Sequence, residues 1–263
     1  MNLLVLDPLE VGSPLPRSDR RVEHTRKILK KGVGDTLAAG LCGGPDVSCP
    51  VGTARVESWD GATMVFSFVP EREAPPLRPV SLILGFPRPI QVSRILKDLT
   101  SLGVRRILMA ATDLGEKSYA ESTIFKEKDF LRPLLEGAEQ AGNPRIPEVG
   151  TFHSLSAALK SLGSALPGEA RWALDPYRGE ALFGSLLHAR EAPSQADPAQ
   201  DGSGRSLRAF TLAVGSERGW TDRELDALGA AGFRFASLGD RILRTETACT
   251  AAVSLALAAL GLC

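Results

Sequence analysis

The stretch LGDRILRTETA, residues 238–248, places a strip of polar and charged side chains between two apolar segments. A short strand pattern precedes it, and the nearly apolar run ACTAAVSLALAALGLC follows it. Charged groups between two buried elements must pair with one another or face a ligand, because burying an unpaired charge is costly. Ile242 and Leu243 are expected to anchor the loop from beneath, and Thr245 and Thr247 to cap the helix that follows.

The sequence upstream of this stretch alternates between strand and helix patterns as far back as residue 80. Such alternation predicts a mostly parallel sheet that is covered by helices on both faces. The predicted strands are VSLILGF (80–86), RRILMAAT (105–112), IPEVGTF (146–152), ARWALDP (170–176), LRAFTLAVG (207–215) and FRFASLG (233–239). The predicted helices between and after them are 89–104, 125–142, 154–162, 221–232 and the apolar tail.

The first seventy residues have a different pattern of short β-rich segments divided by Gly, Pro and Asp, which favours a small β-barrel. The segment PEREAPPLRP that follows carries four prolines in ten residues, a composition typical of linkers. We therefore expect a β-barrel domain at 1–72, a linker at 73–79 and an α/β domain at 80–263. Residues 189–206 are rich in Pro, Ser, Gly, Asp and Gln and are expected to form a flexible insertion within the second domain.

Charge is balanced over the whole chain, with 31 Lys and Arg against 31 Asp and Glu. It is not balanced locally, since residues 17–31 hold seven Lys and Arg against two acids. Such a segment is either a solvated face or a surface that contacts phosphates.

The four cysteines and three histidines show no metal-ligand spacing, which argues against a zinc site and against a disulfide framework. No secretory leader pattern precedes the short apolar start, so a cytoplasmic location is expected. The apolar tail is short for a membrane span and rich in Ala, which favours a buried or interface helix.

Two further predicted strand ends carry unusual content, WALDPY (172–177) and AVGSERGWTDRE (213–224). Ligands of open parallel sheets bind at the carboxyl ends of strands. Gly215 and Gly219 would let the backbone approach a ligand closely, and the next helix opens with a capping-box pattern. The charged residues of these loops, Glu217, Arg218, Arg241, Arg244 and Glu246, would either neutralise one another or line a polar pocket. Neither a Walker A loop nor a GxGxxG motif is present in the sequence.

The segment 238–248, with 213–224 upstream, resembles the small-subunit (16S) ribosomal RNA uracil-N3 methyltransferases of the SPOUT superfamily. Three weaker motifs agree in order and spacing: RVEHTRKILKKGVGD (21–35), ILKDLTSLGVRRILMAATDLGEKS (95–118) and PLLEGAEQAGNPRIPEV (133–149). The resemblance implies a PUA-like β-barrel followed by an α/β domain tied in a deep trefoil knot, an exception to the rule against knots. It also implies a homodimer with the last helix in the interface, S-adenosylmethionine as cofactor, 16S rRNA as partner, and neither a metal nor a membrane.

Carried over residue by residue, the resemblance assigns three groups of site residues. Cofactor contacts fall on Leu174, Asp175, Gly215, Ser216, Glu217, Gly219, Leu238, Gly239, Arg241, Ile242, Leu243 and Thr245. Catalytic roles fall on Arg244, as stabiliser of the charge that develops on the uracil, and on Glu217, as base or orienting group, with Glu246 as second candidate. RNA contacts fall on Arg17, Arg20, Arg21, His24, Arg26 and Lys30.

The sequence departs from the family at several positions. Where the family has Gly-Pro-Glu-Gly-Gly, this chain has Ser216 and Arg218, and Ser101 and Lys30 replace a Glu and an Arg. These departures keep open a non-catalytic rRNA-binding or assembly protein on the same scaffold. A methyltransferase of the same class that acts on another RNA position is the other alternative.

Overall fold

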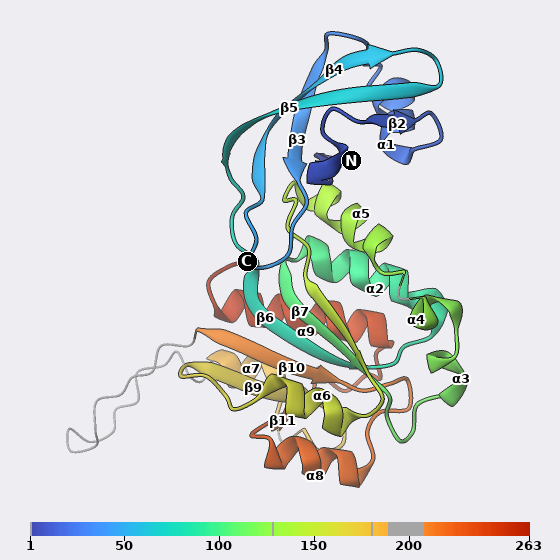
Figure 1. The fold of residues 1–263 in the computed structure, drawn as a ribbon. Coiled ribbons are helices and arrows are strands. Elements are labelled where there is room, and N and C mark those ends of the chain that lie inside the picture. The colour runs from blue at the N-terminus through green and yellow to red at the C-terminus, as the bar shows by residue number, and fades with distance from the viewer. Residues whose placement is uncertain (1, 128, 180, 189–207) are drawn as a thin grey trace, which may run out of the picture. The chain divides into compact units, whose positions relative to one another are not determined.

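The computed structural model describes residues 2–127, 129–179, 181–188 and 208–263. The chain forms two compact units (Figure 1). The first contains Met1–Leu77 and Leu131–Pro147, and the second contains Arg78–Phe130 and Glu148–Cys263.

The first unit is built on a curled five-stranded sheet in the order β1-β3-β4-β5-β2. Its strands are β1 (Leu4–Leu6), β2 (Pro14–Pro16), β3 (Thr36–Leu41), β4 (Pro50–Trp59) and β5 (Thr63–Glu73). The neighbours pair antiparallel except β1 and β3, and two register shifts in the β4–β5 ladder accompany the curl. Leu6, Val56, Met64 and Phe66 form its core. The expected small β domain is present as a half-barrel, because the order of the described strands does not close from β2 back to β1.

Short helices complete the first unit: η1 (Pro8–Glu10), α1 (Arg20–Glu23), the π-helical η2 (His24–Ile28) and α5 (Leu131–Ala141). The expected domain 80–263 includes α5, whereas the structure groups Leu131–Pro147 with the first unit. The backbone N–H groups of Asn2 and Leu3 donate to the Glu139 carbonyl, and the Glu139 carboxylate binds Arg20. The sequence shows only a helix pattern between two strand patterns, which does not predict that residues 131–147 belong to the first unit.

The second unit is a six-stranded sheet in the order β11-β9-β10-β6-β7-β8, and all its pairs are parallel, as predicted. Its strands are β6 (Arg78–Gly85), β7 (Val104–Ala110), β8 (Glu148–Phe152), β9 (Glu169–Leu174), β10 (Ala209–Val214) and β11 (Arg234–Ala236). The central strands are buried on both sides, which explains their continuous apolar runs.

Helices cover both faces of this sheet (Figure 1). On one face α9 (Thr245–Ala259) packs against α2 (Pro89–Ser101), α7 (Phe183–His188) and the central strands. On the other, α6 (Leu155–Leu162) and α8 (Asp222–Ala230) pack together over a core that includes Ile83 and Leu108. The predicted helix 125–142 is divided, since α4 (Thr123–Lys126) and α5 are separate and α3 (Lys117–Ala120) precedes them.

The apolar tail forms α9, whose side chains Ala252, Val253, Ala256 and Leu257 are buried. No helix within the described residues is long and apolar enough to cross a membrane. The expected insertion at 189–206 lies outside the described residues.

Candidate functional site

A cavity of about 650 Å³ opens at one edge of the parallel sheet, where four neighbouring strands end. Its walls come from the segments that follow β9, β10, β11 and β6. In chain order the sheet grows outward from β6 through β7 to β8, and β10 then lies on the other side of β6. The cavity therefore lies at a change in strand order, the usual ligand site of open parallel sheets. Every residue that the sequence assigned to the cofactor or to catalysis lines this cavity.

The loop after β10 is a tight turn that only glycine permits at two points. The Gly219 N–H donates to the Ser216 carbonyl over 2.9 Å, and Gly219 has φ +75°. A Cβ on Gly215 would lie 2.9 Å from the Gly219 backbone. On the neighbouring strand, a Cβ on Gly85 would lie 2.4 Å from the Ser216 nitrogen. The loop is thus packed backbone to backbone, and its shape is set by Gly215, Gly219 and Gly85.

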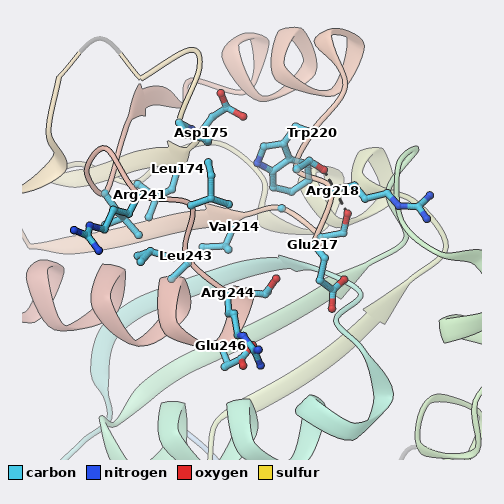
Figure 2. A pocket seen from close by; sticks show the side chains of 18 of the residues that line it. Leu174, Asp175, Val214, Glu217, Arg218, Trp220, Arg241, Leu243, Arg244 and Glu246 are labelled. Atoms are coloured by element: carbon cyan, nitrogen blue, oxygen red, sulfur yellow. Dashed lines mark hydrogen bonds between the residues drawn. The ribbon is translucent and has the colours of Figure 1, made fainter.

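The two departures from the family do not strain this loop. Arg218 is exposed and lies 3.8 Å from Glu116, and Figure 2 shows it directed away from Leu174 and Val214. Its φ is not positive, since Lys30 is the one non-glycine residue with positive φ in the described ranges. Ser216 is buried, and its hydroxyl lies 3.4 Å from the Gly219 carbonyl. The position occupied by Arg218 therefore does not require glycine.

Asp175, at the end of β9, is buried and shapes the loop that follows it. Its Oδ1 accepts the N–H groups of Tyr177 at 2.9 Å and Arg178 at 2.7 Å. A few residues later, the Phe183 N–H donates to the Ser237 carbonyl, which links the segment after β9 to the segment after β11. The structure thus gives Asp175 a turn-forming role at the cavity wall.

The stretch 238–248 forms the third wall, but two expectations about it are wrong. Ile242 and Leu243 do not anchor the loop from beneath: Ile242 is 71% exposed and Leu243 37% exposed. Thr245 and Thr247 do not cap α9, because its N-cap is Arg244, which makes no side-chain capping bond. The loop instead turns at Gly239, which has φ +128°. A Cβ at this position would meet open space.

Arg244 and Glu217 both line the cavity but differ in their contacts (Figure 2). The Arg244 guanidinium has neither an ion pair nor a hydrogen bond with any residue that the structure describes, so it does not pair with Glu217 or Glu246. Glu217 Oε1 accepts the backbone N–H of Arg88 at 2.9 Å. The cavity thus contains a free cation and a carboxylate tied to the start of α2.

Among the cavity residues to which the sequence assigned no role, two bear on the chemistry. Trp220 is buried, and its indole N–H has no hydrogen-bond partner within the described part of the chain. Asp175 and Leu174 line the same cavity. Arg88, the second of these residues, lies between two prolines at the start of α2. Its position directly after a strand that ends at the same sheet edge was the available clue.

The predicted RNA-binding residues of the first unit fall into two groups. Arg17, Arg26 and Lys30 are exposed, and the Arg26 guanidinium lies 4.1 Å from the centre of the Trp59 ring. Lys30 has φ 53° and follows the π-helical η2, two uncommon backbone features in one short segment.

The second group consists of Arg20, Arg21 and His24, which have ion pairs or buried atoms within the fold. Arg20 forms a two-pronged ion pair with Glu139, at 2.6 and 2.9 Å. Arg21 is 12% exposed; burial lowers its pKa, but contacts with Glu10 and Asp19 outweigh this and raise it. Burial lowers the pKa of His24, and its buried Nε2 has no partner in the described structure. Arg21 is therefore occupied within the fold, and burial disfavours the charged form of His24.

The other ionisable clusters are structural. No group of three or more His, Cys, Asp or Glu within the described ranges could hold a metal ion. The predicted capping box of α8 is confirmed, with Thr221 and Glu224 bonded reciprocally. Glu224 also accepts the Asp113 N–H at 2.9 Å, which fixes the segment after β7 to the start of α8.

Comparison with known proteins places the chain in a family. A family model described as an RNA methyltransferase domain matches residues 73–257. Over 264 aligned residues the chain is 33% identical to ribosomal RNA small subunit methyltransferase E of Treponema pallidum, covering 98% of this chain and 91% of the relative. The chain belongs to this RNA methyltransferase family. Small subunit methyltransferase E 1 of Borreliella burgdorferi is 28% identical, over 96% of this chain and 95% of its own.

Solved structures agree with this family's fold. A putative methyltransferase from Legionella pneumophila in complex with SAM has a TM-score of 0.69 at 22% identity, covering 98% of both chains. Small subunit methyltransferase E from Neisseria gonorrhoeae, bound to S-adenosyl methionine, has a TM-score of 0.64 at 21% identity, covering 98% of this chain and 97% of its own. This methyltransferase-family chain therefore has the fold of those proteins.

Proposed function

We propose that this protein is an S-adenosylmethionine-dependent methyltransferase that methylates N3 of one uridine in 16S ribosomal RNA. The observation that carries the proposal is the cavity at the carboxyl ends of β9, β10, β11 and β6, in a chain that matches small subunit methyltransferase E over nearly its full length. The relatives from Legionella and Neisseria hold the same cofactor in the same fold.

The residues present fit this cofactor. Gly239 lines the cavity, and a Cβ there would project into open space, so its bare backbone is available to a ligand. In the second loop, Gly215 and Gly219 leave the backbone without side chains at two further points of the lining. The unpartnered N–H of Trp220 is a donor in the same wall, and a buried donor without an acceptor costs roughly 1–3 kcal/mol. The nucleoside and amino acid parts of the cofactor carry the acceptors that such a wall needs.

When bound, S-adenosylmethionine supplies a methyl group on a positively charged sulfur. N3 of uracil carries a proton, and its removal leaves negative charge on O2 and O4 of the ring. Arg244 stabilises this charge, because its guanidinium is free of any described acidic partner and faces the cavity. Fixed donors aimed at developing charge contribute about 2.7–4 kcal/mol each in water-excluded sites. The cofactor would supply the methyl group that N3 receives as the sulfur–methyl bond breaks, and the N3 proton would pass to a carboxylate that lines the cavity.

Glu217 acts as an orienting group in this proposal. One of its oxygens already accepts the Arg88 N–H, and the residue lines the cavity. The bond spans 129 positions of sequence and holds the loop after β10 against the start of α2. Glu246, on the first turn of α9, remains the second carboxylate of the cavity.

Two finer features of the fold belong to the proposal. The deep knot is supported by the bonds between the segments after β9 and β11, at Ala181, Phe183 and Ser237. The homodimer, with α9 in its interface, is supported by large apolar side chains exposed near the cavity, Tyr177 at 88% and Ile242 at 71%. Light scattering of the purified protein at two concentrations tests the dimer.

Two measurements test the function. Calorimetric titration with S-adenosylmethionine should show saturable binding, whereas a folded protein that does not bind it would be the non-catalytic rRNA-binding protein. Mass spectrometry of 16S rRNA from cells that lack the gene should reveal the loss of a methyl group from one uridine. Loss from another base or another RNA would instead assign the same enzyme class to a different target.

A further inference from the structure

Arg88 has a backbone held rigidly and a side chain left free. Proline precedes and follows it, so the backbone on both sides is restricted, and Arg88 itself is extended with φ −51° and ψ 133°. Its side chain is 65% exposed, and the residue lines the cavity. The one acid near the guanidinium in the described residues is Glu217, 4.0 Å from Nε, and an exposed pair at that distance contributes little.

The helix position of Arg88 is also unusual. It is the N-cap of α2, where Ser, Thr, Asp and Asn are favoured and where a cation opposes the helix dipole. In the same unit, α6 and α8 begin with the usual caps Ser154 and Thr221. The other helix that begins with arginine at this cavity is α9, with Arg244. Two cations thus lie where local stability disfavours them, both at the cavity, and such exceptions to local rules are expected at functional sites.

We infer that Arg88 binds a backbone phosphate of the RNA strand that carries the target uridine. This inference rests on the proposed function and extends it, because it adds an RNA contact on the α/β unit to the basic segment of the first unit. The free guanidinium matches the bidentate geometry of phosphate oxygens. A phosphate bound by Arg88 would position the base for Arg244, which lines the same cavity.

Salt dependence of rRNA binding measures this contact directly. For a single strand, each phosphate contact contributes about 0.7 to the slope of log affinity against log salt. Arg88→Gln should therefore reduce the slope by about 0.7, which is about fivefold in affinity at 0.1 M salt. The bond from Glu217 is to the Arg88 backbone, so the variant keeps it. Arg88→Lys keeps the charge and should keep most of the slope.

The chain offers a matched control on the same helix. Arg94 is 69% exposed, pairs weakly with Asp98 at 3.7 Å and does not line the cavity. Arg94→Gln makes the same change in net charge and should leave the slope unchanged. The binding assay uses full-length protein with 16S rRNA in filter binding over a series of KCl concentrations, without cofactor. Calorimetry should show that both variants bind S-adenosylmethionine like the parent protein.

Equal slopes for Arg88→Gln and Arg94→Gln would overturn the inference. So would a loss of cofactor affinity in Arg88→Gln with an unchanged slope, because it would place Arg88 in the cofactor wall. Failure of the proposed function gives a different pattern, in which the parent protein binds no cofactor and transfers no methyl group. The slope comparison needs no turnover and remains decisive in that case.

Discussion

At the scale of single residues, Arg244 occupies a helix position that disfavours arginine, and its charge has no partner among the described residues. It is the N-cap of α9 without a capping bond, and its cation lies at the positive end of the helix dipole. A residue that breaks local rules at a cavity is a candidate for function, because neither helix propensity nor pairing explains it.

Arg244→Ser should therefore separate stability from activity. Serine is a good N-cap, so the free energy of unfolding should rise by about 1 kcal/mol. Methyl transfer should fall by about 10²- to 10³-fold, because the donor for the charge on the uracil is gone. Urea unfolding and initial rates with labelled cofactor measure the two effects. A stabilised variant with an unchanged rate would remove Arg244 from the catalytic proposal.

At the scale of elements, the cavity depends on loops whose backbones touch. Gly215→Ala would place a Cβ 2.9 Å from Gly219, backbone that cannot move without reshaping the turn. We expect cofactor affinity to fall at least tenfold, as measured by calorimetry. Gly184→Ala is the control, since this glycine lies in α7 and its Cβ would meet no atom closer than 3.8 Å. That variant should bind normally, and equal binding by both would refute the fixed shape of the loop.

The N-terminal ends of β9 and β10 hold a buried ion pair, on the sheet edge opposite the cavity. Glu169 and Arg171 lie 3.1 Å apart and are 9% and 5% exposed, and Thr211 donates to Glu169 over 2.6 Å. Burial raises the pKa of Glu169, but bonds from Thr211, the Leu166 amide and Arg171 outweigh burial and hold it below its ordinary 4.5. The unfolded chain therefore takes up this proton first as the pH falls.

The contribution of Glu169 to stability should be complete above about pH 4.5 and be lost as the pH falls through its lowered pKa. Glu169→Gln should cost about 3 kcal/mol at pH 7, because Arg171 stays buried without its partner, and should reduce the loss of stability on acidification. Urea midpoints at pH 7 and pH 4 measure both. In the control Glu148→Gln, the pair with Arg106 is more exposed, so we expect at most about 1 kcal/mol. Equal losses of unfolding free energy in Glu169→Gln and Glu148→Gln would contradict the larger contribution that we assign to the buried pair.

The element pattern was largely predictable from sequence, and the exceptions have physical reasons. Strict alternation of apolar runs and amphipathic helices predicted the parallel sheet, and the residues at its strand ends were gathered into one cavity as expected. Capping of α8 was predictable because it is local. The cap of α9 was not, since capping propensity favours a threonine, whereas Thr245 is the first residue of the helix and the N-cap is Arg244. Arg88 was missed because no motif contains it, and its importance comes from the strand order.

At the scale of the whole molecule, neutral net charge hides a basic segment in the first unit. The double variant Arg26→Glu and Lys30→Glu should weaken rRNA binding at least tenfold at 0.1 M salt, because both side chains are exposed. Filter binding against the double variant Arg55→Glu and Arg72→Glu, on β4 and β5, provides a control with the same net charge. A similar loss in both would assign the effect to overall charge rather than to the basic segment.

The return of the chain into the first unit at Leu131–Pro147 has a consequence for synthesis. A nascent chain of 77 residues lacks Glu139, the partner of Arg20 and of the Asn2 and Leu3 amides. It also lacks Arg145, whose guanidinium bonds the Val47 carbonyl and Glu73. The N-terminal half-barrel must therefore wait, partly assembled, until roughly twice its length has left the ribosome. Its completion therefore follows the synthesis of β6 and β7, although its own sheet comes first in the gene.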